Sequence, residues 1–337
     1  MWKEIFYEKR FWVLFSLLII FCIISLMIGS ISTSFYELFR LNHPDNSLLK
    51  RVVLEHRLPR TLTAMLTGIA LPISGWVLQE FFRNPLAGPS VLGITSASGL
   101  GVALVIVLGT SLGLSHWVNQ SWLLILGALA GALIATILLI WTAHKISSTT
   151  SLIIVGFMLA ALAGAFIGVL EFFASGKDLK SYVLWSFGSL NGLSNDRLYY
   201  FLICCIIGVL LVIFKIDALI KMQLGELYAR TMGVDVRSLR LQLIIASSVL
   251  TGVTTALVGP IAFIGLAVPH ICRIYLKTAD FRKLFIYIIM VGVILMIVFS
   301  VISEIFPGGA LPINIITALL GAPIVLSIVL NYKGREL

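Results

Sequence analysis

The sequence predicts an all-α membrane protein whose single domain, residues 1–337, crosses the bilayer about ten times. Of the 337 residues, 59% are apolar and only 12% are charged, and the mean hydropathy is +1.07. Soluble globular domains carry about twice that share of charge. A spanning helix needs about 20 mostly apolar residues, and apolar segments of about that length recur along the whole chain.

The predicted membrane segments begin close to the N-terminus. The first is longer than a signal-peptide core of roughly 7–15 residues, so we expect it to be retained as a helix. The ten segments are 11–31, 61–80, 91–110, 121–142, 150–173, 197–214, 241–258, 260–276, 284–303 and 311–330. Outer loops are expected over 32–60 and 174–196, and a cytoplasmic region over about 216–240.

The seventh and eighth segments are separated by a break within one apolar run. As a single helix, residues 241–276 would be about 54 Å long, while the hydrocarbon core is roughly 30 Å thick. Pro260 follows Gly259 there, and proline removes a backbone donor and clashes with the preceding turn. The chain is therefore expected to cross twice, which keeps the basic residues that flank the run on one side of the membrane.

The basic residues predict the orientation. With both termini in the cytoplasm, most of the 24 Lys and Arg residues fall on the cytoplasmic side. This asymmetry explains the net charge of +9, so no nucleic-acid partner is expected. The four cysteines lie in or beside apolar segments without metal-ligand spacing, and no metal site is predicted.

The polar residues argue against several mechanisms. Ion-coupled transporters keep charged groups inside their helices, but here only Glu80, Glu171 and Glu304 touch apolar segments, each near a predicted end. The sequence shows no nucleophile paired with a base at membrane depth, which an intramembrane enzyme would need. It also contains no phosphate-binding loop. An ion-coupled secondary transporter and an intramembrane enzyme remain the alternatives, and the favoured source of energy is an ATPase on another chain.

Residues 224–240 form the one long polar, helix-competent stretch between apolar segments. Glu226, Ala229 and Gly233 fall at helical spacing, and the glycine is a stop signal. Arg230 and nearby arginines favour the cytoplasmic side. The stretch is predicted to be a docking helix for a soluble partner, with the contact residues Leu224, Gly225, Glu226, Ala229, Arg230 and Gly233.

Six motifs in order along the chain resemble those of one family, the ten-helix permeases of ABC importers for iron-siderophores, haem and cobalamin. These motifs are Arg57-Leu58-Pro59-Arg60, Arg83-Asn84-Pro85-Leu86-Ala87, Trp185 with Gly188-Ser189-Leu190, the 224–240 stretch, Gly259-Pro260 with Gly265 and Pro269-His270, and Leu311-Pro312 with Gly321-Ala322-Pro323. The resemblance covers nearly the whole chain. Where the family often carries a further outer arginine, this chain has Ser303-Glu304.

The resemblance implies alternating access in a homodimer of the bacterial inner membrane. ATP and Mg would bind to separate cytoplasmic ABC ATPase subunits, and this chain would carry no cofactor and no catalytic residue. An extracytoplasmic binding protein would dock on Arg57 and Arg60. The substrate would be an iron chelate, with siderophore chosen by family frequency and haem or cobalamin as alternatives.

The resemblance also assigns roles within the membrane. The fifth and last segments would line the pathway. Gly259, Pro260, Gly265, Pro269 and His270 would form a structural motif, since a lone histidine is more often structural than a metal ligand. The cytoplasmic gate would consist of Asn84, Pro85, Leu86, Thr149 and Thr150.

Overall fold

The computed structural model describes residues 8–29, 47–111, 121–146, 148–278, 280–306 and 310–331, and every regular element in these ranges is helical. Ten helices overlap the ten predicted membrane segments one for one. They are α2 (Lys9–Met27), α5 (Leu58–Phe82), α6 (Ile94–Ser111), α8 (Ser121–Lys145), α9 (Thr149–Phe173), α11 (Asn195–Ile213), α14 (Val236–Val258), α15 (Ile264–Leu276), α16 (Phe281–Ile305) and α17 (Ile313–Asn331). The predicted fold class is confirmed.

One of these helices is clearly shorter than the sequence predicted. Among the described residues, eight helices are long and apolar enough to cross a membrane, while α15 and residues 313–327 of α17 are shorter apolar helices. The predicted segment 260–276 loses its first turn, because Gly259 and Phe263 have left-handed φ angles of 88° and 66°. With 13 residues, α15 is about 20 Å long, so it covers only part of a bilayer.

The described parts of the two expected outer loops contain short helices, and residues 32–46 of the first lie outside the described residues. The short helix α4 (Ser47–Val52) and the π-helical turn η2 (Val53–Arg57) run directly into α5, because backbone hydrogen bonds continue through these polar residues. The second expected loop contains α10 (Gly176–Ser186), which starts at Ser175, whose hydroxyl accepts the backbone N–H of Asp178 at 3.2 Å. Such a cap satisfies an otherwise unpaired donor.

The helix α5 is the centre of the bundle and packs against α11, α14, α15 and α16. Its close contacts use glycine at Gly68 and Gly75: a Cβ at Gly75 would lie 1.8 Å from the carbonyl oxygen of Gly265 in α15. A Cβ at Gly68 would lie 2.5 Å from the carbonyl oxygen of Gly292 in α16. Glycine allows such backbone contact between helices in lipid, where no hydrophobic force drives association.

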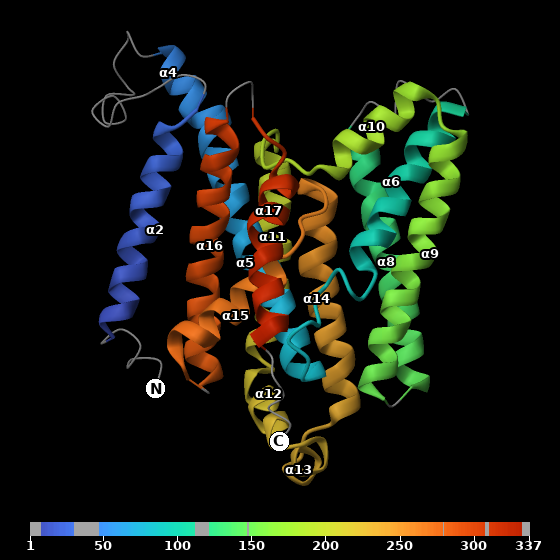
Figure 1. Ribbon diagram of the computed structural model, residues 1–337, viewed down its shortest axis with the longest axis vertical. Helices are drawn as coiled ribbons and strands as arrows, with labels where there is room; N and C mark the ends of the chain where they lie inside the picture. Colours follow the sequence, from blue (N-terminus) through green and yellow to red (C-terminus); the bar gives the residue numbers. More distant parts are fainter. Residues whose placement is uncertain are drawn as a thin grey trace.

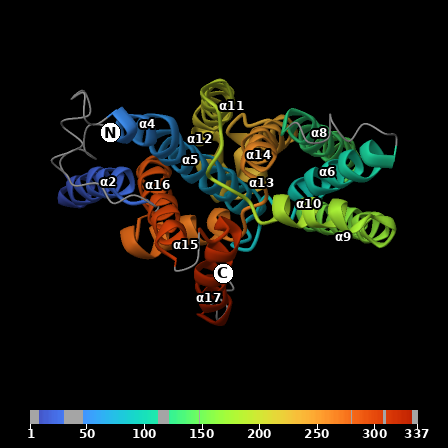
Figure 2. The same cartoon turned by 90° about the horizontal axis from the view of Figure 1, so that it is seen from above.

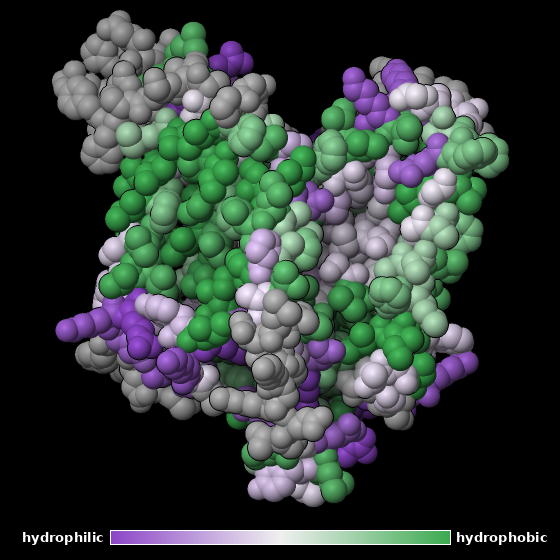
Figure 3. Space-filling model, viewed as in Figure 1, coloured by the Kyte–Doolittle hydropathy of each residue, from purple (hydrophilic) through white to green (hydrophobic). Residues whose placement is uncertain are grey.

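A second group of helices, α6, α8, α9 and α10, lies beside this bundle and joins it through α14. Figure 1 places α4 and α10 at one end of the molecule and α12 and α13 at the other, and we call these the α10 end and the α13 end. Apolar side chains cover a broad area over α2 and α16 between these ends, with hydrophilic residues gathered toward the α13 end (Figure 3). This distribution is that of a chain surrounded by lipid.

Candidate functional site

The polar stretch forms a projection at the α13 end, below the bundle in Figure 1. It is not one helix over 224–240, as the sequence suggested: it divides into α13 (Glu226–Thr231) and the start of α14, and a further helix, α12 (Ile216–Gln223), ends just before it. Gly225 and Gly233 interrupt it with φ angles of 116° and 81°, which favour glycine. We call residues 216–240 the coupling segment.

The side chains of α13 divide into one that anchors the helix and several that face outward. Ala229 is fully buried against the bundle, so it supports α13 and does not offer a contact surface, which corrects its predicted role. Leu227 and Tyr228 are 80% and 53% exposed. Glu226 accepts a hydrogen bond from Arg230 at 2.7 Å, one helical turn away. The projection therefore presents apolar side chains beside an ion pair.

The predicted gate residue Asn84 lies in a tight turn directly after α5. Arg83 ends that helix in the left-handed conformation, with φ 49°. The Oδ1 atom of Asn84 then accepts the backbone N–H of Leu86 at 2.9 Å, a side-chain turn typical of asparagine. The side chain of Leu86 is 42% exposed.

The other predicted gate residues lie at the start of α9. Ser148 caps this helix by accepting the backbone N–H of Ser151 at 3.3 Å. Thr150 is exposed, and the side chain of Thr149 lies outside the described residues. The turn after Asn84 reaches α9 further along, where a Cβ at Gly93 would lie 2.8 Å from the carbonyl oxygen of Gly156. The contact thus joins the chain that follows Asn84 to α9, and a gate at residues 84–86 and 149–150 stays a prediction.

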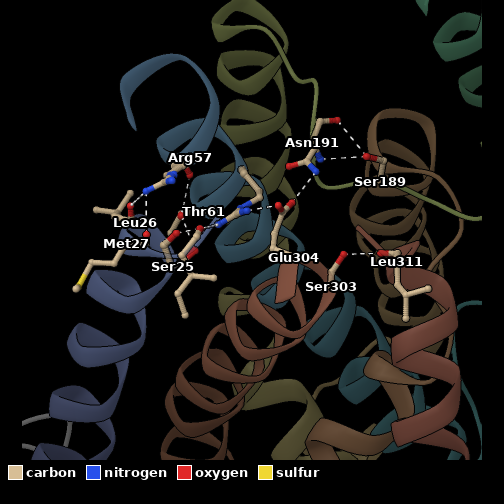
Figure 4. A network of polar contacts seen from close by, with 12 residues as sticks. Ser25, Leu26, Met27, Arg57, Thr61, Ser189, Asn191, Ser303, Glu304 and Leu311 are labelled. Carbon is tan, nitrogen blue, oxygen red and sulfur yellow. Dashed lines mark hydrogen bonds and ion pairs between the residues drawn. The ribbon is translucent and has the colours of Figure 1, made fainter. Parts of the chain in front are cut away.

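The outer arginines Arg57 and Arg60 are buried, with exposures of 3% and 4%. Arg57 donates to the carbonyl oxygens of Leu26 and Met27, both at 2.9 Å, at the C-terminal end of α2 (Figure 4). Arg60 donates to the carbonyl of Ser25 at 2.8 Å. Both guanidinium groups thus bind within the chain, because the carbonyls at a helix end attract cations. Docking on this pair stays a prediction.

The acid at the position of the family's further arginine has a partner inside the chain. Glu304 forms an ion pair with Arg60 at 3.0 Å and accepts a hydrogen bond from Asn191 at 3.0 Å. It is 15% exposed, so its charge is largely neutralised in place. Figure 4 shows this bridge between α5, α16 and the chain before α11.

The predicted structural motif lies where the chain turns back between α14 and α15. A Cβ at Gly259 would lie 2.8 Å from Cα of Gly188, so the two motifs pack backbone to backbone. Pro269 is buried inside α15, and His270 is half-buried beside it. No group of three metal-ligating side chains occurs within the described ranges.

Three arginine contacts at the α13 end were not predicted from the sequence, where these residues indicated only family motifs and sides of the membrane. Arg273 donates to Gln79 at 3.1 Å and to Glu80 at 2.6 Å. Arg83 donates to the carbonyl of Met222, and Arg240 donates to that of Ile146 at 2.8 Å. These pairs are at least 94 positions apart, so no local pattern could reveal them. Arg83 and Arg273 also line a cavity of about 520 Å³.

The fold is that of an all-helical membrane protein with many membrane-spanning helices and a polar projection at one end. The FecCD transport family matches residues 17–331. The chain belongs to this family.

The relatives agree with the family over most of the chain. The hemin transport system permease HmuU of Yersinia pestis is 35% identical over 331 residues, which cover 95% of each chain. The vitamin B12 import system permease BtuC of Klebsiella pneumoniae is 34% identical over 281 residues, which cover 83% of this chain and 82% of the relative. A solved metal-chelate type ABC transporter in an inward-facing conformation has a TM-score of 0.84 and 29% identity, covering 96% and 99% of the two chains.

The family resemblance inferred from the motifs is thereby confirmed. The protein is the transmembrane permease of an ATP-driven importer of the bacterial inner membrane, and not a catalytic subunit. Membership in the family implies a separate ATPase and a substrate-binding partner.

Proposed function

We propose that this permease imports an iron chelate, with an iron-siderophore favoured over haem and cobalamin. Relatives that carry haem and vitamin B12, and a similar structure of metal-chelate type, support a large chelate as the substrate. The helix proposed to line the pathway, α9, presents apolar side chains and small residues and little charge, which suits weak contact with a bulky molecule in transit.

The observation that carries the mechanism is the projecting helix α13, where the ATPase is proposed to dock. Leu224, Leu227, Tyr228 and Met232 are 65%, 80%, 53% and 43% exposed on this projection, and an exposed apolar patch rimmed by polar groups marks a protein contact. The coupling segment carries Lys221, Arg230 and Arg237, which favour the cytoplasmic side. We therefore assign the α13 end to the cytoplasm and the α10 end to the binding protein.

The working unit is proposed to be a homodimer with α9 and α17 along its axis. These two helices lie along the same side of the molecule when it is seen from above (Figure 2). Gly164 and Gly168 of α9 are four positions apart, and a Cβ at either would meet no other atom of the described ranges within 4 Å. Two small residues at this spacing form a surface on which a second helix packs in membranes, and a second copy would supply it.

The proposal is tested by uptake into proteoliposomes that contain the permease with its ATPase and its binding protein. We expect accumulation of a ferric siderophore that depends on ATP and stops with a hydrolysis-deficient ATPase. Haem and cyanocobalamin, tested in parallel, rank the substrate classes. Uptake driven by a proton or sodium gradient without ATP would overturn the mechanism, and uptake of none of the three compounds would overturn the substrate class.

A further inference from the structure

The coupling segment is connected to α9 by contacts that the family motifs do not define. The main contacts of α13 are with α12 and α14. A displacement of α13 is therefore transmitted to the rest of the protein through one of these two helices. Each of these two helices takes part in a contact between an arginine and backbone carbonyls, and the two contacts lead to different parts of α9.

The first bond joins the start of α14 to the end of α8. Arg240 is 5% exposed, and its Nη1 atom donates to the carbonyl of Ile146 at 2.8 Å and to that of Ala143 at 3.4 Å. Carbonyls at the end of a helix lack partners within the helix and carry partial negative charge. Ile146 lies two positions before Ser148, the cap of α9. Arg240 therefore holds the joint between α8 and α9.

The second bond joins the end of α12 to the turn after α5. The Nη2 atom of Arg83 donates to the carbonyl of Met222, in the last turn of α12. Arg83 is followed directly by the Asn84 turn, which ends at Gly93 in backbone contact with Gly156 of α9. A displacement of Met222 therefore reaches Gly156, in the third turn of α9, through the short segment 83–93.

The two bonds share a fixed support at the end of α5. Arg273 of α15 holds Gln79 and Glu80 at 3.1 and 2.6 Å, so the last turn of α5 is tied to the central bundle. The guanidinium of Arg240 lies over the ring of Phe81, 5.9 Å from its centroid. Movement of the coupling segment relative to this support would turn the Asn84 segment and the α8–α9 joint together.

We propose that Arg83 and Arg240 are positioning residues that transmit movement of the coupling segment to α9 through their bonds to the carbonyls of Met222 and Ile146. This inference rests on the proposed docking of the ATPase at α13 and the proposed pathway along α9. A hydrogen bond from a cation to a carbonyl is stronger than a neutral one, so each bond resists being pulled apart. Both must hold for ATP binding to move the start of α9.

The test follows the start of α9 with a single cysteine, Thr150→Cys, in a protein whose four native cysteines are replaced by alanine. The permease is held in nanodiscs with its ATPase, and the rate of modification by N-ethylmaleimide is measured with and without ATP and vanadate. With both arginines intact, ATP is expected to change this rate. In Arg83→Gln and Arg240→Gln together, we expect the ATP-dependent change to fall by about fivefold or more, with ATPase binding and hydrolysis retained.

A matched control is Arg10→Gln, which removes a bond from Arg10 to the carbonyl of Tyr275, at 3.4 Å, between α2 and α15. It removes the same kind of bond, from an arginine to a backbone carbonyl, outside the coupling segment. The ATP-dependent change in the modification rate should therefore be unaffected. The conservative variants Arg83→Lys and Arg240→Lys keep a cationic donor and should restore part of the response. If the double variant does not assemble with the ATPase, the two single variants decide, because each removes one bond.

The outcomes separate this inference from the proposed function. A full ATP-dependent change in the arginine variants would overturn the transmission role. An ATPase that does not bind, or no ATP-dependent change with both arginines intact, would instead overturn the proposed docking or pathway. An equal loss in Arg10→Gln would show that the arginine variants act only by weakening the fold.

Discussion

Arg60 and Glu304 form an ion pair in which both charges are largely removed from solvent. Arg60 is 4% exposed, Glu304 is 15% exposed, and their N and O atoms are 3.0 Å apart. Arg60 also bonds to the carbonyls of Ser25 and Ile28 at 2.8 and 3.1 Å. A buried cation is costly unless it is paired, so Glu304 compensates the charge that ties α2 to α5.

We therefore expect Glu304→Gln to lower the free energy of unfolding by about 3 kcal/mol, at the low end for a broken buried pair because Glu304 keeps some contact with water. Thermal unfolding in detergent measures the change. The matched control is Glu55→Gln, which breaks an exposed pair with Arg51 at 2.9 Å and should leave the melting temperature unchanged. Equal melting temperatures for both variants would mean that the Arg60 pair does not stabilise the fold.

At the α13 end, Glu8 lies just before α2 and pairs with α16. Its carboxylate accepts a hydrogen bond from Lys283 at 2.7 Å and one from Tyr287 at 2.9 Å. The bond from Lys283, opposed by partial burial, holds the pKa of the Glu8 carboxyl below its ordinary value of 4.5. The pair therefore stabilises the fold above that value, where the carboxyl is ionised in both states.

The sign of this pKa shift predicts a pH dependence. The stabilisation by Glu8 should be lost as the pH falls from its ordinary pKa through its lower folded value. Wild type should melt at a higher temperature than Glu8→Gln near neutral pH, and the two should converge in acid. Melting curves across the pH range measure the difference. A gap that stays constant down to acid pH would contradict the role of the charge.

At the scale of elements, the close approach of helices to α5 sets the strictest requirement on sequence. Gly75 contacts the backbone of α15, where a methyl group would lie 1.8 Å from the carbonyl oxygen of Gly265. Backbone cannot move aside as a flexible side chain can, so the helices would have to separate. Separation would also disturb the contact of Arg273 with Gln79 and Glu80 at the end of α5.

Gly75→Ala is thus expected to destabilise the protein by about 1–3 kcal/mol, as overpacking does. A fitting comparison is Gly252→Ala in α14, where the new methyl would meet only the methyl group of Ala132, at 3.0 Å, among the described residues. That change should cost less, because the alanine also favours the helix. Melting temperatures of the two variants provide the measurement, and an equal or larger loss in Gly252→Ala would contradict the tight contact.

Most of the membrane helices could be predicted from the sequence, and the places where the prediction failed have a physical cause. The length of the apolar segments predicts the ten helices, because a chain in lipid must form its backbone hydrogen bonds within each segment. The helices before α5 and at α10 are polar and were expected as loops. The burial of Arg57 depends on carbonyls about 30 positions away, and the bond of Arg83 reaches Met222 from 139 positions away. No local pattern contains such contacts.

At the scale of the whole molecule, the side of α9 with Gly164 and Gly168 is open in the part of the single chain that the structure describes. If a second copy covers it, Gly164→Leu with Gly168→Leu should convert a dimer into a monomer, because large side chains keep helix backbones apart. Light scattering of the detergent-solubilised protein gives the mass directly. A dimer that persists in the double variant would place the interface elsewhere.

The central claim is that a separate ATPase drives this permease through α13, and copurification with the ATPase tests it most directly. Leu227→Glu places a charge at the exposed tip of α13, whereas the control, Leu48→Glu, changes a leucine that is 69% exposed near the α10 end. The account predicts that Leu227→Glu loses the ATPase and ATP-dependent uptake while Leu48→Glu keeps both. Full ATPase binding and uptake in Leu227→Glu would contradict it.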